Sequence, residues 1–236
     1  MSRNGPIALA FNALVIAFML APLLVVCIVA FTPENTLTIP TTHFSLRWFE
    51  AVFAHPDFMQ SFWNSLWLAL SAATIATLLA VPAGMAITRY DFPGRDFLNG
   101  LFLSPLIIPH LVLGVALLRL VVAALVGFDR SAEQAALSLG ASQATVFRRI
   151  TLPMILPGVT GGWMLAFINS FDEVTMSIFV TSPSTVTLPV RMYMYATESI
   201  DPLMAAVSAL MVAVTAVAMV VLDRLYGLDR VLVGRK

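Results

Sequence analysis

The sequence from Asp129 to Pro157 reads DRSAEQAALSLGASQATVFRRITLPMILP, a polar and basic segment between strongly apolar ones. Ser131 with Gln134 three residues later fits a capping box, in which side chains satisfy the free amides of a helix's first turn. Good helix formers follow, and Gly140 can adopt the left-handed conformation that ends a helix. This stretch therefore predicts a short helix followed by a turn.

A second helix is predicted after that turn. Ser142 can cap it through its side-chain oxygen, and the helix should run through Ile150. Proline lacks an amide donor and disfavours helix in the residue before it, so we expect this helix to end near Pro153. The result is a helix-turn-helix between segments that look membrane-embedded, which suggests a docking surface for a soluble partner.

The composition indicates an integral membrane protein. Of 236 residues, 59% are hydrophobic and only 11% are charged, whereas charged residues make up roughly a quarter of soluble domains. The net charge is zero, so no overall field attracts nucleic acid. The single cysteine, Cys27, lies in an apolar run, which excludes a disulfide framework or a thiolate metal cluster within one chain and predicts a small buried hydrophobe.

Five apolar stretches are long enough to cross a bilayer, for which a helix needs about 20 residues. These spans are residues 7–31, 61–88, 97–126, 158–180 and 203–222. The first is longer than a signal-peptide core and lacks a clear cleavage site, so we expect it to be retained. The expected fold is an all-α integral membrane protein, with residues 1–236 forming one transmembrane domain and residues 128–157 its central loop.

The distribution of basic residues predicts the orientation of the chain. They concentrate near the N-terminus at Arg3, in a turn with Arg89 and Arg95, in the central loop with Arg130, Arg148 and Arg149, and in the tail with Arg235 and Lys236. Basic residues in short loops remain cytoplasmic, so both termini and the central loop are expected on the cytoplasmic side. Only about 30 residues, 97–126, separate the turn with Arg89 from the central loop, whereas returning to the same side takes two crossings of about 20 residues each. This stretch is therefore long enough for one crossing and too short for two.

The central loop resembles the EAA signature of permease subunits of ATP-binding-cassette (ABC) importers. That signature is Glu-Ala-Ala, a glycine four residues after the last alanine, and Ile-x-Leu-Pro ten residues later. The matching residues here are Ala135, Ala136, Gly140, Ile150, Leu152 and Pro153. Gln134 occupies the glutamate position, with Glu133 just before it. This departure removes the motif carboxylate from its usual place and leaves the helix-turn-helix shape intact.

The resemblance extends over most of the chain. Residues 167–193, FINSFDEVTMSIFVTSPSTVTLPVRMY, look most like the second permease subunits of spermidine/putrescine importers. The resemblance implies a type I ABC importer transmembrane-domain fold in the bacterial inner membrane, with six spans in the family where we count five. Residues 117–121, LLRLV, look like two of the family's span ends fused, so our hypothesis is that one span is missing near Arg119; the alternative is a re-entrant or broken hairpin.

The same resemblance implies how the protein works. The first short helix of the loop would be a coupling helix that rests in a groove on a cytoplasmic ATPase. The implied ATPase-coupling residues are Glu133, Gln134, Ala135, Ala136, Gly140, Ile150, Leu152 and Pro153. The chain would bind no cofactor, because ATP and Mg²⁺ belong to the ATPase. The implied partners are a second permease subunit in a heterodimer, an ATPase dimer, an extracytoplasmic substrate-binding protein and membrane lipid, with no nucleic acid.

Two carboxylates are candidates for the translocation pathway. Asp172 and Glu173 lie inside the apolar stretch 158–180, where ionisable residues are costly and usually face a cavity or pathway. In a polyamine importer they could balance a ligand ammonium. The alternative interpretation is that they lie near the outer end of the span and contact water or the following loop.

Other functions are compatible with parts of the sequence. Residues 139–150, LGASQATVFRRI, resemble a DNA-reading helix-turn-helix, but apolar spans begin within a few residues on both sides. An intramembrane enzyme could use Asp172, Glu173 or His110, yet the sequence has no GxxxxGK[ST], HExxH or GxSxG motif. Among importers, the alternative substrates are ferric ion, thiamine or a phosphonate, because selectivity in this family rests largely with the separate binding protein.

Overall fold

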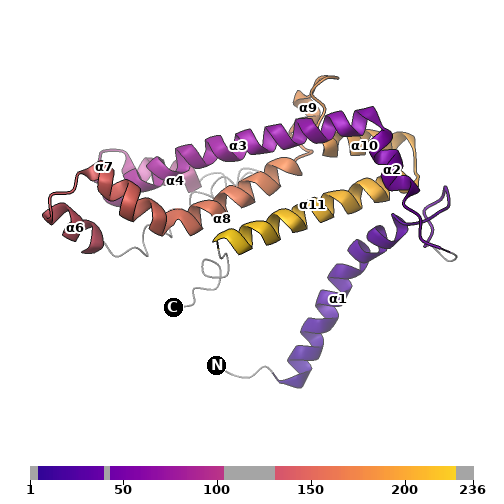
Figure 1. Ribbon diagram of the computed structural model, residues 1–236, viewed down its shortest axis with the longest axis horizontal. Helices are drawn as coiled ribbons and strands as arrows, with labels where there is room; N and C mark the ends of the chain where they lie inside the picture. The colour runs from indigo at the N-terminus through magenta and orange to yellow at the C-terminus, as the bar shows by residue number, and fades with distance from the viewer. Residues whose placement is uncertain (1–4, 40–42, 104–130, 227–236) are drawn as a thin grey trace. The chain divides into compact units, whose positions relative to one another are not determined.

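The computed structural model describes residues 5–39, 43–103 and 131–226, and every regular element within these ranges is a helix (Figure 1). Four helical stretches are long and apolar enough to cross a membrane: Ile7–Val29, Pro56–Arg89, Gln143–Phe171 and Pro202–Val221. The expected span 97–126 lies largely outside the described residues, as do His110 and Arg119. The hypothesis of a missing span therefore stays a prediction.

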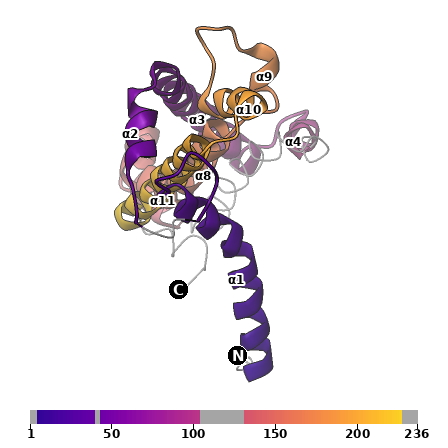
Figure 2. The same cartoon turned by 90° about the vertical axis from the view of Figure 1, so that its right-hand side faces the viewer.

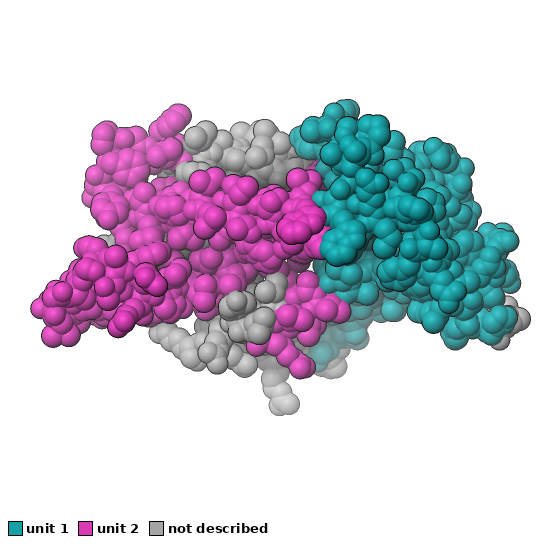
Figure 3. All heavy atoms as spheres, turned by 45° about the horizontal axis from the view of Figure 1, so that its top comes forward, with its two compact units in different colours: residues 1–64, 174–216 teal, residues 65–173, 217–236 magenta. Residues whose placement is uncertain are grey.

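The described residues form a series of helices. In chain order they are α1 (Pro6–Val29), α2 (Arg47–Ala54), α3 (Pro56–Arg89), α4 (Arg95–Leu103), α6 (Ser131–Ser138), α7 (Gln143–Val146), the π-helical turn η2 (Phe147–Thr151), α8 (Leu152–Phe171), α9 (Ser177–Val180), α10 (Leu188–Glu198) and α11 (Pro202–Tyr226). They form two compact units (Figure 3). Unit 1 comprises Met1–Asn64 and Val174–Ala216, and unit 2 comprises Ser65–Glu173 and Val217–Lys236.

In unit 1, α10 lies along the first turns of α3 (Figures 1 and 2). The side-chain amide of Asn64 in α3 donates hydrogen bonds to the carbonyls of Ser184 and Val186, at 3.1 and 3.0 Å. Arg191 of α10 forms an ion pair with Asp57 of α3 at 3.5 Å. These polar contacts fasten the segment before α10, and α10 itself, to the beginning of α3.

A second connection in unit 1 joins α10 to α11. The Tyr195 hydroxyl donates to an Asp201 oxygen at 2.7 Å, and the other carboxylate oxygen of Asp201 accepts the amide of Leu203 at the start of α11. Burial raises the pKa of Tyr195 to about 12, and the hydrogen bond to Asp201 adds to the increase. The ring of Tyr195 lies 5.5 Å from that of Phe58, which is fully buried in α3.

Helix α1 exposes most of its apolar surface. Residues 7–25 are exposed, and only Val29 and Ala30 at its end are buried. A helix satisfies its own backbone hydrogen bonds, so an apolar helix of this length is stable in contact with lipid. Cys27, which the sequence predicts to be a small buried hydrophobe, is only half-buried because so much of α1 is uncovered.

In unit 2, α8 packs against the second half of α3. Ile155 of α8 is fully buried and, with Val159, contacts Val81 and Met85 of α3. The Trp163 indole N–H donates to the Thr74 hydroxyl of α3 at 3.3 Å. Small buried residues lie on both helices, namely Ala69, Ala73 and Ala80 on α3 and Gly158, Gly161 and Gly162 on α8. Such residues let the backbones of membrane helices approach closely.

The helical stretch Gln143–Phe171 differs from two predictions, namely a helix end near Pro153 and a span that continues to residue 180. It does not stop near Pro153: the chain is helical without a break from Gln143 to Phe171. Pro153 lies in the first turn of α8, directly after η2, where the Leu152 amide bonds to the carbonyl of Phe147 five residues back. This wider turn and the position of Pro153 let the helix continue without the missing proline amide.

At its other end the helix stops earlier than the predicted limit at residue 180. α8 ends at Phe171, and the Asp172 amide makes the last helical hydrogen bond, to the Ile168 carbonyl. Residues 172–176 are not helical and lead to the short helix α9. The apolar run 158–180 is therefore a helix end, a turn and a second helix, and the change occurs where the first charged side chain makes burial in lipid costly.

Candidate functional site

The polar helix α6 ends as its sequence predicts. The Ala141 amide bonds to the Ala136 carbonyl, and the Gly140 amide bonds to the Leu137 carbonyl. This pair of bonds is the Schellman motif, which requires a left-handed residue at the position of Gly140. Gly140 has a φ of +86°, and a Cβ there would meet nothing within 4 Å, so the backbone conformation alone favours glycine.

The next helix begins with the predicted cap. The Ser142 hydroxyl accepts a hydrogen bond from the Thr145 amide at 3.3 Å, and the two hydroxyls lie 2.9 Å apart. The cap satisfies an amide that would otherwise lack a partner in the first turn of α7. The helix-turn-helix predicted from the sequence is therefore confirmed as far as the cap, with the longer second helix described above.

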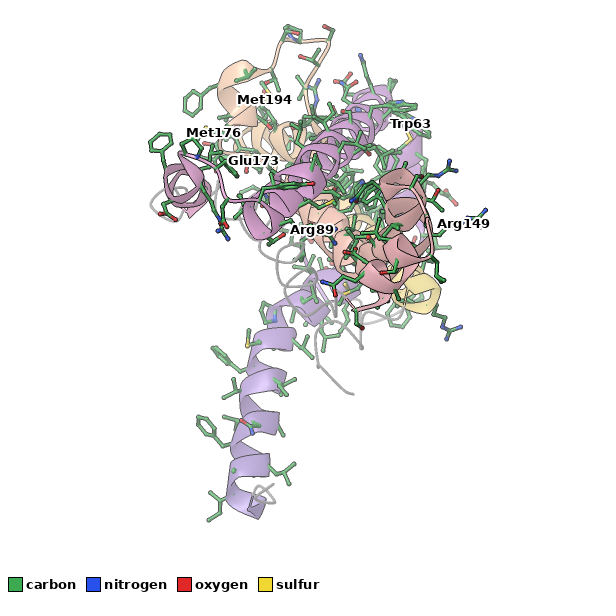
Figure 4. The ribbon with its side chains drawn as sticks, turned by 90° about the vertical axis from the view of Figure 1, so that its left-hand side faces the viewer. Trp63, Arg89, Arg149, Glu173, Met176 and Met194 are labelled. Carbon is green, nitrogen blue, oxygen red and sulfur yellow. The ribbon has the colours of Figure 1, made fainter. Side chains whose placement is uncertain are left out.

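Glu133 is the only buried residue of α6, at 7% exposure. One of its carboxylate oxygens accepts a hydrogen bond from Arg89, the last residue of α3, at 2.7 Å. The same oxygen accepts the hydroxyl of Thr151, which is fully buried at the end of η2. One carboxylate thus connects α6, α3 and η2; Figure 4 labels Arg89 at this junction.

The sequence singles out Glu133 but not its two partners. From the sequence, Arg89 is predicted to be an ordinary basic residue of a cytoplasmic turn, and no role is predicted for Thr151. The available signal was that a carboxylate in a helix next to apolar spans needs a compensating cation, for which a basic residue at a span end is the natural source. Only the fold shows which of the basic residues it is.

The opposite side of α6 is open to solvent. Gln134, Ala135 and Gly140 are exposed, while Ala136 is half-buried. Leu139, one helical turn beyond Ala135, is 90% exposed. An exposed leucine beside alanine and glycine makes a low, apolar surface that a partner can approach closely. Sequence reasoning missed Leu139, although a leucine immediately before the turn glycine was visible.

The second half of the sequence motif has a different environment. Ile150 and Leu152 are half-buried, and Leu152 packs against the Ile155 and Val159 cluster, whereas Pro153 is exposed. Arg148 and Arg149 are exposed on η2, with Arg149 at its outer edge in Figure 4. Ile150 and Leu152 therefore join the loop to the packed pair of α3 and α8 rather than to the exposed face of α6.

The two candidate pathway carboxylates lie just beyond the end of α8. Asp172 is exposed and Glu173 is half-buried. Partial loss of hydration raises the pKa of Asp172 above its ordinary value, and the charge of Glu173 adds a smaller increase. On α8 the rings of Trp163, Phe167 and Phe171 are stacked in succession, with centroids 5.6 and 5.8 Å apart, and end next to Asp172.

Comparison with known proteins places this arrangement in a family. A family model described as "Binding-protein-dependent transport system inner membrane component" matches residues 1–228. The spermidine/putrescine transport system permease protein PotC of Haemophilus influenzae is 30% identical over 244 residues, which cover 92% of this chain and 94% of PotC. PotC of Escherichia coli K12 is 28% identical over 248 residues, 93% of each chain.

Two further similarities are informative. The putrescine transport system permease protein PotI of Escherichia coli K12 is 30% identical over 220 residues, 78% of each chain. A crystal structure of a bacterial ABC transporter involved in the import of the acidic polysaccharide alginate has the same fold, with a TM-score of 0.69 at 13% identity, over 95% of this chain and 97% of that one.

These matches confirm the expected fold class and the resemblance to ABC importer permeases. Permeases of this family have no cofactor of their own, and a partner ATPase hydrolyses the ATP. The chain belongs to the family of binding-protein-dependent transport system inner membrane components: it is a multi-pass inner-membrane permease of an ABC importer, and not itself an enzyme.

Proposed function

We propose that this chain is a permease subunit of a polyamine importer. The supporting observation is its similarity along nearly the whole chain to spermidine/putrescine permeases, at 28–30% identity and 92–93% coverage. A molybdate/tungstate permease, WtpB of Thermococcus kodakarensis, is 32% identical, but only over 152 residues, 53% of this chain. The longer match favours a cationic polyamine over an oxyanion as the transported solute.

We propose that α6 is the coupling helix. The exposed surface of α6 and of the turn after it, with Ala135, Leu139 and Gly140, would rest on a cytoplasmic ATPase, and the basic residues Arg148 and Arg149 would lie at its edge. Closure of an ATPase dimer would then move this helix and shift the permease between inward- and outward-facing states. The other proposed partners are a second permease subunit and an extracytoplasmic substrate-binding protein.

We further propose that Asp172 and Glu173 serve the translocation pathway. Their position at the end of a membrane helix keeps both carboxylates within reach of solvent, where a hydrated cation can first meet them. An ammonium group close by favours the charged form of a carboxylate whose pKa is raised by desolvation. Binding of a cation would thus compensate part of the cost of holding Asp172 in its present environment.

The substrate is tested with the reconstituted importer in proteoliposomes. With the cognate binding protein present, spermidine or putrescine is expected to stimulate ATP hydrolysis and to accumulate in the vesicles. Molybdate, ferric ion, thiamine and a phosphonate serve as competitors that should leave uptake unchanged. Stimulation by one of these solutes but not by a polyamine would replace the proposed substrate and keep the importer.

The pathway role predicts a loss of uptake in Asp172→Asn. We expect spermidine uptake to fall about tenfold, which corresponds to about 1.4 kcal/mol of lost interaction with the cation. ATP hydrolysis without ligand should be unchanged, because Asp172 lies beyond α8 and away from α6. The matched control is Asp91→Asn, which neutralises an exposed carboxylate in the turn before α4. Full uptake by Asp172→Asn would exclude this carboxylate from the pathway.

A further inference from the structure

The buried carboxylate of Glu133 holds two hydrogen-bond donors from different helices. Arg89 donates from the end of α3 at 2.7 Å, and Thr151 donates from the end of η2. The side chains of Glu133 and Arg89 are 9% and 18% exposed, and Thr151 is fully buried. A buried charge is costly unless it is paired and hydrogen-bonded, so losing either of these contacts would be unfavourable.

The two donors stand at the ends of the long helices of unit 2. Arg89 is the last residue of α3, and Thr151 directly precedes α8. α3 and α8 are packed together through Ile155 and through the hydrogen bond from Trp163 to Thr74. A displacement of the Glu133 carboxylate would therefore change contacts at the ends of both helices, which are packed against each other.

Nothing else in α6 is buried. Gln134, which follows Glu133 and occupies the glutamate position of the sequence motif, is exposed. The surface for an ATPase and the attachment to the spanning helices therefore lie on different sides of the same short helix. The attachment depends on Glu133, and the exposed surface does not.

We propose that Glu133 is the joint through which movement of α6 reaches α3 and α8, with Arg89 and Thr151 as its positioning residues. This role rests on the proposed docking of α6 on an ATPase. The π-helical turn η2 lies between α7 and α8 and ends at Thr151. Glu133 therefore contacts the chain where its backbone departs from α-helical geometry. Such turns occur frequently at functional sites.

The joint predicts uncoupling rather than loss of assembly. In Arg89→Ala and Glu133→Ala, the ATPase should still co-purify, because the exposed surface of α6 is unchanged. ATP hydrolysis should continue, whereas the amount of spermidine taken up per ATP hydrolysed is expected to fall at least tenfold. Glu198→Ala is the matched control: it removes an exposed glutamate from the end of α10 and should keep the wild-type ratio.

Charge reversal distinguishes the joint from a general structural role. The double variant Arg89→Glu with Glu133→Arg restores the ion pair with the charges exchanged. Its uptake-to-hydrolysis ratio is expected to recover to within about threefold of wild type, well above the ratio of either single reversal. A double variant no better than its parents would overturn the proposal, as would single variants that transport with the wild-type ratio.

Two milder variants keep the test decisive if the alanine variants fail to accumulate in the membrane. Glu133→Gln and Thr151→Val preserve side-chain size and remove, respectively, the charge and the hydroxyl. Each should lower the ratio while the ATPase remains bound, and a wild-type ratio in both would overturn the proposal. If even the wild-type chain retained no ATPase, the docking of α6 itself would be wrong, which is a different outcome from uncoupling.

Discussion

Leu139→Glu is expected to reduce co-purification of the ATPase with the permease at least tenfold. Leu139 is 90% exposed beside Gly140, on the surface proposed to meet the ATPase. Burying a leucine side chain contributes about 1.5–3 kcal/mol, and a glutamate at the same position would also have to lose its hydration. A loss of about 1.4 kcal/mol already corresponds to tenfold weaker binding.

The matched control is Ile200→Glu. Ile200 is also an exposed apolar residue, at 80%, but it lies between α10 and α11. Both substitutions remove an exposed apolar side chain, so both variants should insert and fold equally well. Only Leu139→Glu should lose the ATPase when the complex is solubilised and pulled down through the permease. Equal retention in both variants would exclude Leu139 from the docking surface.

The parts of the fold that depend on local chemistry were predictable from the sequence. Gly140 ends α6 in the left-handed conformation, and Ser142 caps α7, because these roles involve only a few neighbouring residues. Three of the four described spans, Ile7–Val29, Pro56–Arg89 and Pro202–Val221, follow from long apolar stretches. No partner distant in sequence is needed for either inference.

The ends of α8 could not be predicted in the same way. Proline and a run of apolar residues indicated a helix from 158 to 180, but the π-helical turn before Pro153 lets the helix begin earlier. Whether a chain tolerates a proline depends on its hydrogen bonding in the preceding turn, which composition does not reveal. At its other end the helix stops at Phe171, directly before Asp172, the first charged residue of the apolar run.

The partners of Glu133 depend on tertiary structure. Arg89 is 44 residues away in the sequence, and several other arginines were equally plausible partners. Motif matching also directed attention to Gln134, because the signature places its carboxylate there. Burial separates the two neighbours: Glu133 faces the spanning helices and Gln134 faces solvent. Sequence alone cannot assign neighbouring helical positions to sides without the packing.

Single cysteines at positions 149 and 184 are expected to react with a membrane-impermeant maleimide from opposite sides of the membrane. α8 has 20 residues and at about 1.5 Å per residue is roughly 30 Å long, the thickness of the hydrocarbon core. Arg149 precedes α8 and Ser184 follows it, and both are exposed. Because basic loops remain cytoplasmic, Arg149→Cys should react only in inside-out vesicles and Ser184→Cys only in intact cells.

The experiment has a clean background, because Cys27 is the only cysteine and can be replaced by alanine. Two contacts of α3 supply its controls. Arg89 at the end of α3 pairs with Glu133, so Asp91→Cys should react from the same side as Arg149→Cys. Near the start of α3, Gln60 and Asn64 contact the Ser184 carbonyl, so Gln60→Cys should react from the same side as Ser184→Cys. Labelling of position 149 in intact cells would put α6 beyond the reach of any cytoplasmic ATPase, and both the docking surface and the Glu133 joint would then have to be abandoned.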